Sequence, residues 1–409
     1  MTASVVRPAS GGLRMSTPPT GVVVVLLAVG AVRMSQLAGE FVTSYPRATL
    51  TSIVLFALLA VPFWLLVSEL DFLEREPTAL RVVAFAWGGL VATTVSIAGG
   101  TALENLVAKL GSPHLAADWG AAITGPTVEE LAKTLGVVAI VLVARSQVNS
   151  VLDGVVYGAM VGLGFQIAED VVFAVGAVAL AGQGDQIQPV IATFLLRGFL
   201  SGIWSHTLFG ALAGAGIGYL VVRRDTLRAA LALLGAWAAH VLWNSPLLGD
   251  GLGNGVLALL GVILLKGLPP LLLVLLLVRR LHDREADYYA GRLATLGDPS
   301  LITPGELAAL RSGARRASAR RLAGARAKPA VRRLQRAQAQ LAVELSRASA
   351  TGIDHWSSVI RSERARLRRL NHPEAIAGPP SWRHTASTVL TTVVAIAVLW
   401  VALSALGGA

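Results

Sequence analysis

The sequence contains no cysteine and little charge, and both absences narrow the range of functions. Without cysteine among its 409 residues, the chain has no disulfide, no thiolate metal site and no cysteine nucleophile. Charged residues make up 14% of the chain and apolar residues 54%, whereas soluble domains carry roughly 25% charged residues. The composition predicts a membrane protein, and it leaves any chemistry to Glu, Asp, His, Ser and Lys.

Nine apolar runs are long enough to cross a bilayer, which takes about 20 helical residues. They lie at about 20–39, 50–68, 81–100, 119–144, 154–180, 190–222, 228–247, 254–278 and 385–406. The first run ends at Arg33 and follows a basic tail, so a cleavable signal peptide is its alternative. We expect an all-α, polytopic membrane helix bundle with an eight-span core and a C-terminal ninth span.

Basic residues in the short loops predict the orientation, because cytoplasmic loops carry the excess of Lys and Arg. With a cytoplasmic N-terminus, the outer loops hold only Arg47 and Lys109. The inner loops then hold Arg7, Arg14, Arg75, Arg81, Arg145, Arg223, Arg224 and Arg228. We therefore expect a multi-pass protein of the plasma membrane whose N-terminus is cytoplasmic.

The net charge of +11 is concentrated in one segment of the chain. Residues 279–384 hold 21 Lys and Arg against 9 Asp and Glu, so the remainder is close to neutral. Within this segment Thr303–Glu306 has the capping-box form with Pro304 at the first helical position, and two or three amphipathic helices should follow up to Leu370. We divide the chain into a membrane-embedded core at 1–280, a basic, partly helical cytoplasmic segment at 281–384, and a transmembrane anchor at 385–409.

The basic segment is expected to act as a helical linker attracted to anionic lipid headgroups. Nucleic-acid binding is not expected, because the charge is accompanied by no nucleic-acid-binding fold signature and no interleaved aromatic residues.

The fourth apolar run contains the stretch GPTVEELAK, residues 125–133, with two carboxylates and an ammonium. An ionised side chain inside a bilayer costs about 3 kcal/mol or more, so such residues mark candidate functional sites. Glu129 and Lys133 are four residues apart on one helix face, so we expect Lys133 to be the counter-ion of Glu129. Glu130 should then find its partner on another helix.

The fifth apolar run places Gly158, Gly162, Phe165 and Glu169 on one helix face, with Asp170 on a different face. The glycines allow a second helix to approach closely, which brings Glu169 against a neighbouring helix. The alternative is a packing stripe in which a protonated glutamate bonds to a backbone carbonyl.

Two further runs carry histidine. His206 lies within a second face of glycines, and Arg197, nine residues earlier, should point to the opposite side or reach the interface by snorkelling. His240 and Asn244 are one turn apart, so together they suit a water, a metal or a developing oxyanion. A hydrogen bond that joins two helices is the alternative for that pair.

These motifs together resemble the signature of the PrsW family of intramembrane proteases. They are Glu129-Glu130-x-x-Lys133, Phe165-x-x-x-Glu169, His206 and His240-x-x-x-Asn244, on successive helices and in this order. The family belongs to a superfamily with the CAAX prenyl endopeptidases and the bacteriocin-immunity proteins. The resemblance covers residues 119–247.

The resemblance implies a role for each motif. Glu129 and Glu130 would include the catalytic carboxylate, with Glu169 and His206 in or beside the site. His240 and Asn244 would stabilise the oxyanion. The supporting residues would be Lys133, Phe165, Asp170 and Arg197, and Asp170 departs from the family, in which an Asn is expected.

We therefore expect hydrolysis of a peptide bond of a membrane protein, with Glu129 as the base that activates a water. We expect the substrate to be a single-pass membrane protein cut near the outer half of the bilayer, because Glu129 is reached from the outer end of its helix and the outer loops are short and nearly uncharged. The family resemblance implies an anti-sigma factor as a candidate substrate. A zinc ion held by Glu129, His206 and His240 ranks second, because no HExxH or similar spacing is present. The alternative function is a proton- or ion-coupled transporter, but the internal repeat typical of such proteins is missing.

Overall fold

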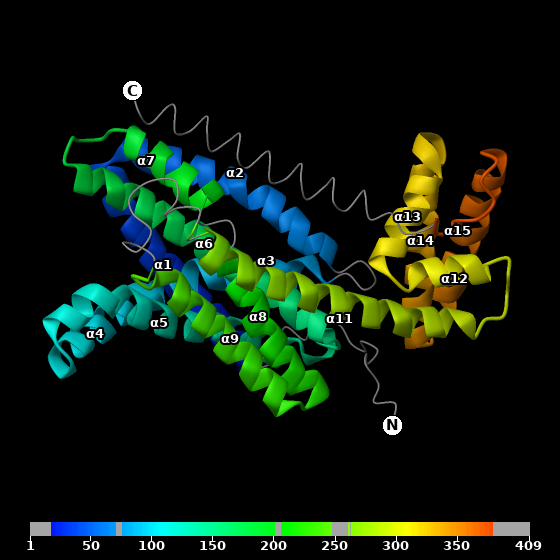
Figure 1. Ribbon diagram of the computed structural model, residues 1–409, viewed down its shortest axis with the longest axis horizontal. Helices are drawn as coiled ribbons and strands as arrows, with labels where there is room; N and C mark the ends of the chain where they lie inside the picture. The colour runs from blue at the N-terminus through cyan, green and yellow to red at the C-terminus, as the bar shows by residue number, and fades with distance from the viewer. Residues whose placement is uncertain (1–17, 71–75, 201–205, 248–260, 262, 379–409) are drawn as a thin grey trace. The chain divides into compact units, whose positions relative to one another are not determined.

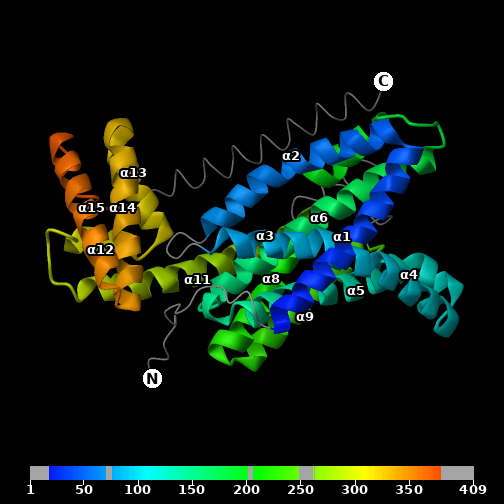
Figure 2. The ribbon, with the colours of Figure 1, turned by 180° about the vertical axis from the view of Figure 1, so that it is seen from behind.

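The computed structural model describes residues 18–70, 76–200, 206–247, 261 and 263–378 (Figures 1 and 2). Within these residues all regular structure is helical and no strand occurs, as predicted. The chain forms two compact units, Met1–Glu285 and Ala286–Ala409.

Five helices in the described residues are long and apolar enough to cross a membrane. Their bounds are Pro18–Ser44 (α1), Pro46–Leu70 (α2), Thr78–Leu110, Val151–Ala181 (α6) and Thr226–Asn244 (α9). The third of them comprises Thr78–Ala86 (α3), the π-helical Trp87–Ala92 (η1) and Thr93–Leu110 (α4). They correspond to the first, second, third, fifth and seventh predicted spans, so the prediction of a multi-pass membrane protein is confirmed.

The other four predicted spans differ in form. The fourth lies within a 31-residue helix, Pro113–Val143 (α5), that carries the charged triplet Glu129, Glu130 and Lys133. The sixth is divided into Gln188–Thr193 (α7), the π-helical Phe194–Leu200 (η3), His206–Gly218 (α8) and the π-helical Tyr219–Arg223 (η5). The eighth is described only from the π-helical Ile263–Gly267 (η6) into Leu268–Ala294 (α11), and the ninth lies outside the described residues.

Helix α6 is the central element of the first unit, since it packs against α2, α3, η1, α5, α7 and α8 (Figure 1). Its closest partner is α8, and the two backbones meet along a row of small residues. A Cβ atom at Gly154, Gly158 or Gly162 would collide with the backbone of Gly214, Gly210 or His206, respectively. The predicted small-residue faces are thus confirmed, and they fix the position of His206 along the axis of α6.

Local sequence signals set where these helices begin and end. Helix α5 begins after the N-cap Ser112, and α6 begins with a capping box formed by Ser150 and Asp153. Between them lies a single turn of 3₁₀-helix, Arg145–Gln147 (η2). Pro126 lies inside α5 one turn before Glu130, where it cannot donate a backbone hydrogen bond to the preceding turn.

Between Pro304 and Leu370 the basic segment folds as four helices rather than the two or three that we expected. These are Pro304–Leu310 (α12), Gly313–Leu322 (α13), Gly324–Arg347 (α14) and Ala350–Arg369 (α15). The predicted capping box at Thr303–Glu306 is present. Leu334, Leu341, Ile360 and Leu367 are fully buried, so the segment has a hydrophobic core of its own.

Candidate active site

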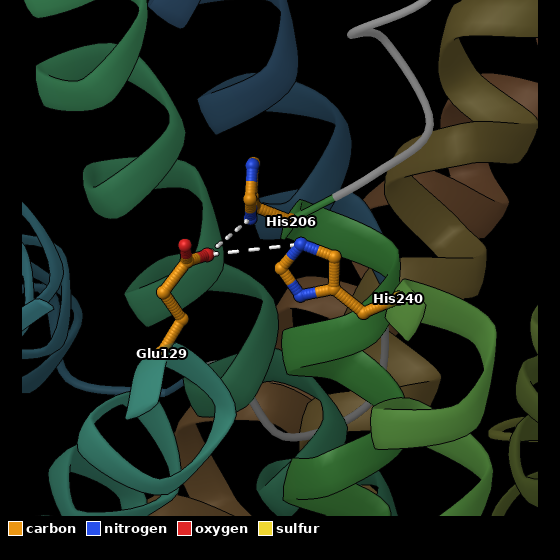
Figure 3. Close-up of side chains that lie close together, drawn as sticks. All are labelled: Glu129, His206 and His240. Atoms are coloured by element: carbon orange, nitrogen blue, oxygen red, sulfur yellow. Dashed lines mark ion pairs between the residues drawn. The ribbon is translucent and has the colours of Figure 1, made fainter. Parts of the chain in front are cut away.

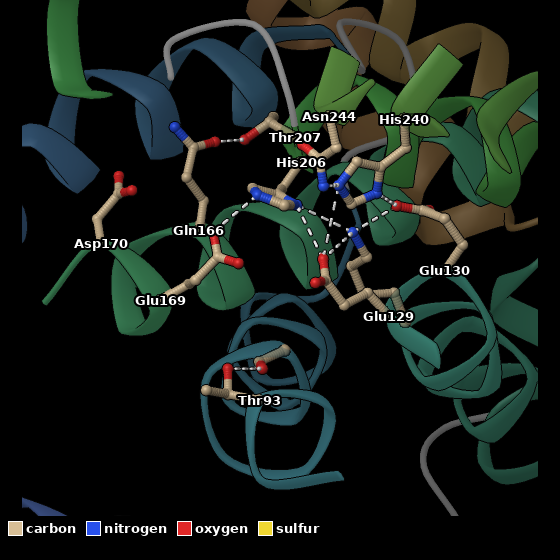
Figure 4. A network of polar contacts seen from close by, with 12 residues as sticks. Thr93, Glu129, Glu130, Gln166, Glu169, Asp170, His206, Thr207, His240 and Asn244 are labelled. Atoms are coloured by element: carbon tan, nitrogen blue, oxygen red, sulfur yellow. Dashed lines mark hydrogen bonds and ion pairs between the residues drawn. The ribbon is translucent and has the colours of Figure 1, made fainter. Parts of the chain in front are cut away.

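The polar residues of four separate helices meet in one buried cluster (Figure 4). Helix α5 supplies Glu129, Glu130 and Lys133, α6 supplies Glu169, α8 supplies His206, and α9 supplies His240. The side chains of Lys133 and His240 are each only 1% exposed. The glycine contacts bring α6 and α8 close enough for the side chains of Glu169 and His206 to meet.

Lys133 pairs with both glutamates of its helix, and more closely with Glu130 than with the expected partner, Glu129. Its Nζ lies 2.6 Å from Glu130 Oε1 and 4.0 Å from Glu129 Oε2. The same Nζ lies 3.1 Å from His206 Nδ1 and 4.6 Å from the centre of the Phe165 ring. Residues three and four apart on a helix are both neighbours, so sequence spacing alone did not predict that Glu130 would be the closer partner.

Each histidine uses one ring nitrogen to bind a carboxylate. His240 Nδ1 lies 2.8 Å from Glu130 Oε1, and His206 Nε2 lies 2.9 Å from Glu169 Oε2. A carboxylate only accepts hydrogen bonds, so these two nitrogens carry the protons. The remaining nitrogens, Nε2 of His240 and Nδ1 of His206, are therefore acceptors when the rings are neutral.

Those two acceptor nitrogens face Glu129 (Figure 3). Glu129 Oε2 lies 3.7 Å from His206 Nδ1 and 3.7 Å from His240 Nε2. It is buried and accepts no hydrogen bond from any described residue. Three electron-rich atoms thus converge within 4.8 Å of one another, an arrangement that a proton, a water or a metal cation placed among them would stabilise.

Arg197 joins the cluster, contrary to the expectation that it would point away from His206. Its Nη2 lies 2.5 Å from Glu169 Oε2 and its Nε 2.6 Å from Asp170 Oδ1. The expectation assumed a continuous α-helix, but Arg197 lies in the π-helical η3, whose winding changes the angle between residues. Asp170 itself points away from the histidines (Figure 4).

Asn244 lies at the edge of the cluster as the last residue of α9. Its Nδ2 is 3.3 Å from His240 Nε2 and donates to the backbone oxygen of Ala121 at 3.2 Å. Lys266 donates to the carbonyl of Ser245 at 2.6 Å, immediately after this helix end. A cation at a helix C-terminus stabilises that end.

Three side chains near the histidines were not predicted from the sequence. Phe209 stacks on His240 with a centroid distance of 4.9 Å, and Thr207 donates to Gln166 at 3.1 Å. Phe209 lies three residues after His206, which is one helical turn, so that spacing could have indicated it. Gln166 and Thr207 each follow a residue of a recognised motif.

The cluster contains more acidic than basic groups. With neutral histidines and ionised carboxylates its formal charge is −2. The four carboxylates are Glu129, Glu130, Glu169 and Asp170, and the two cations are Lys133 and Arg197. A buried excess of negative charge requires a compensating cation or bound protons.

Residues 76–277 match the family model described as PrsW family intramembrane metalloprotease. The match includes every residue of the cluster and confirms the resemblance of the motifs. No curated protein and no solved structure matches the chain.

Proposed function

Through residues 76–277 the chain belongs to the PrsW family of intramembrane proteases, and from this premise we propose that the buried cluster hydrolyses a peptide bond of a membrane protein. The observation that carries the proposal is the convergence of Glu129, His206 and His240 from three helices. The family match favours hydrolysis over the proton- or ion-coupled transporter that buried acids and histidines alone would also fit.

We further propose that Glu129, His206 and His240 hold a zinc ion. Two histidines and one glutamate form a donor set found at catalytic zinc sites. Each histidine has its second nitrogen on a carboxylate, and metal-bound histidines almost always donate that N–H to a carboxylate, a backbone carbonyl or a water. A divalent cation would also balance the formal charge of the cluster.

From the sequence alone, a metal-free site with Glu129 as the base ranked first and a zinc site second. We now propose the zinc site instead. Sequence spacing does not reveal that both histidines turn an acceptor nitrogen toward Glu129 Oε2. Lys133 contacts His206 Nδ1, so on metal binding it would give up that contact and keep Glu130.

When bound, zinc polarises a carbonyl oxygen and favours ionisation of a water. The chain's own groups would then move the proton. We assign it to Glu130, whose Oε2 is buried and accepts no hydrogen bond from the described residues. Lys133 lies 2.6 Å from the other oxygen and keeps this carboxylate ionised before the reaction. From Glu130 the proton would pass to the leaving amine, while Asn244 Nδ2 donates to the oxyanion.

The substrate and the topology follow from sequence arguments. We propose a single-pass membrane protein, with an anti-sigma factor as the first candidate, cut in the outer half of the bilayer. The excess of Lys and Arg in alternate loops supports a cytoplasmic N-terminus in the plasma membrane.

For the second unit we propose binding to anionic lipid headgroups. Exposed basic residues lie on the first half of α14 and the second half of α15, and an ion pair of 2.8 Å between Arg333 and Glu363 joins these halves. They are Arg326, Lys328, Arg332, Arg333, Arg361, Arg366, Arg368 and Arg369. Each basic residue close to an anionic membrane contributes about 1 kcal/mol.

Glu129→Gln tests the proposed activity most simply, because it keeps the shape of the side chain and removes its charge. We expect no cleavage of a reconstituted single-pass substrate and an unchanged melting temperature. Full activity of the variant would refute the assignment, and a collapse in melting temperature would make Glu129 structural. Comparing the membrane proteomes of cells with either form, and sequencing the new termini, would identify the substrate.

A further inference from the structure

Arg197 has no part in the proton transfers proposed above, yet it makes two short ion pairs at the edge of the cluster. Its guanidinium contacts two carboxylates that are adjacent in the chain, Glu169 through Nη2 and Asp170 through Nε. Arginine has a planar, rigid fork of donors, so binding both carboxylates fixes the orientation of the group.

Two further contacts hold this guanidinium in place. Asp170 is 0% exposed, and its second oxygen accepts no hydrogen bond from the described residues, so Arg197 is its charge partner. The ring of Phe173 lies 4.0 Å from the Arg197 guanidinium carbon. An arginine stacked on an aromatic ring and paired with a buried aspartate has little freedom to move.

The contact that connects Arg197 to the histidines is a shared oxygen. Glu169 Oε2 accepts from Arg197 at 2.5 Å and from His206 Nε2 at 2.9 Å. The position of Arg197 therefore selects the rotamer of Glu169 that receives the His206 proton. That hydrogen bond in turn directs His206 Nδ1 toward Glu129.

This edge of the cluster is partly exposed. The side chain of Arg197 is 27% exposed and that of Glu169 17%, whereas His206 is 5% exposed. Water that reaches Glu169 would compete with His206 for its oxygen. Arg197 covers this carboxylate and keeps it directed inward.

We propose that Arg197, anchored by Asp170, is a positioning residue that holds Glu169 and thereby sets the metal-binding orientation of His206. This rests on the proposed zinc site. The proposal also gives Asp170 a function. The family resemblance predicts an Asn at this position, and the carboxylate that stands here instead binds Nε of Arg197.

The test measures metal binding rather than activity. Purified protein is loaded with Co²⁺, and affinity and the visible absorption spectrum are compared for wild type, Arg197→Gln, Arg197→Lys and the double variant Arg197→Gln/Asp170→Asn. The double variant avoids leaving an unpaired buried carboxylate, so it keeps the test valid if the single variant does not fold. Arg228→Gln, which breaks the Arg228–Asp225 pair at the start of α9, is the matched control.

We expect Arg197→Gln and the double variant to bind Co²⁺ about 10–100-fold more weakly, as is typical when an outer partner of a metal-bound histidine is removed. Arg197→Lys should recover part of the affinity, because an ammonium replaces the charge but not the fork. Arg228→Gln should bind as wild type does. Wild-type affinity and spectrum in the double variant would refute the positioning role alone, whereas a wild-type protein that binds no Co²⁺ would refute the zinc site as well.

Discussion

Replacing Gly162 by alanine perturbs the site from outside it. The new Cβ would collide with the carbonyl oxygen of His206, and it would lie 2.8 Å from that carbonyl carbon and 3.0 Å from Thr207 Cα. Ordinary contacts of a Cβ begin at 3.4 Å, so α8 must move away from α6 by at least 0.6 Å. His206 is the first residue of α8 and moves with it.

A displacement of this size at a catalytic group should lower the reaction rate, since a misplacement of about 1 Å can lower it about 100-fold. We therefore expect Gly162→Ala to lower kcat at least about tenfold and to destabilise the fold by about 1–3 kcal/mol. The assay is cleavage of a reconstituted membrane substrate, with a thermal melt of the same sample.

Gly176→Ala is the matched control, because Gly176 lies on the same helix and a Cβ there meets no atom within 4 Å. It should retain full activity and melt no lower than wild type, since alanine favours a helix by about 1 kcal/mol over glycine. Wild-type kcat and melting temperature in Gly162→Ala would show that the two helices are not held at the distance described above.

Three other changes test separate parts of the molecule. Asn244→Ala should lower kcat about 100-fold with little change in KM or zinc content; an unchanged kcat in steady-state kinetics would remove Asn244 from oxyanion binding. Glu306→Ala should leave the buried Arg364 without its carboxylate and destabilise the second unit by about 3–5 kcal/mol. Amide hydrogen exchange in α12–α15 would report this as faster exchange, and unchanged rates would contradict it. Neutralising the four exposed arginines in residues 361–369 should reduce the phosphatidylglycerol that the full chain retains on purification, as measured by mass spectrometry, and undiminished retention would count against headgroup binding.

The cluster was predictable because its residues lie in apolar runs, where each charge stands out. Glu169 and His206 also lie at helical spacing from glycines, and those glycines bring α6 and α8 together. Five predicted spans follow equally directly from the lengths of the apolar runs.

What the sequence did not predict depends on details finer than spacing. The choice of Lys133 between Glu129 and Glu130 is made by side-chain rotamers and by His240 on another helix. The direction of Arg197 depends on a π-helical segment that no residue in the run marks. In the second unit, the hydrophobic core was not predicted from the arginine-rich sequence. The buried positions of α14 are largely alanine and glutamine, which give only a weak hydrophobic pattern.

The central claim, a zinc ion held by Glu129, His206 and His240, is tested most directly by measuring the zinc content and turnover of the same purified protein, before and after chelation. We predict about one zinc ion per chain, loss of turnover when it is removed, recovery when zinc is returned, and loss of zinc in His240→Ala. Full turnover by zinc-free protein would contradict the account and would make Glu129 the base of a metal-free protease.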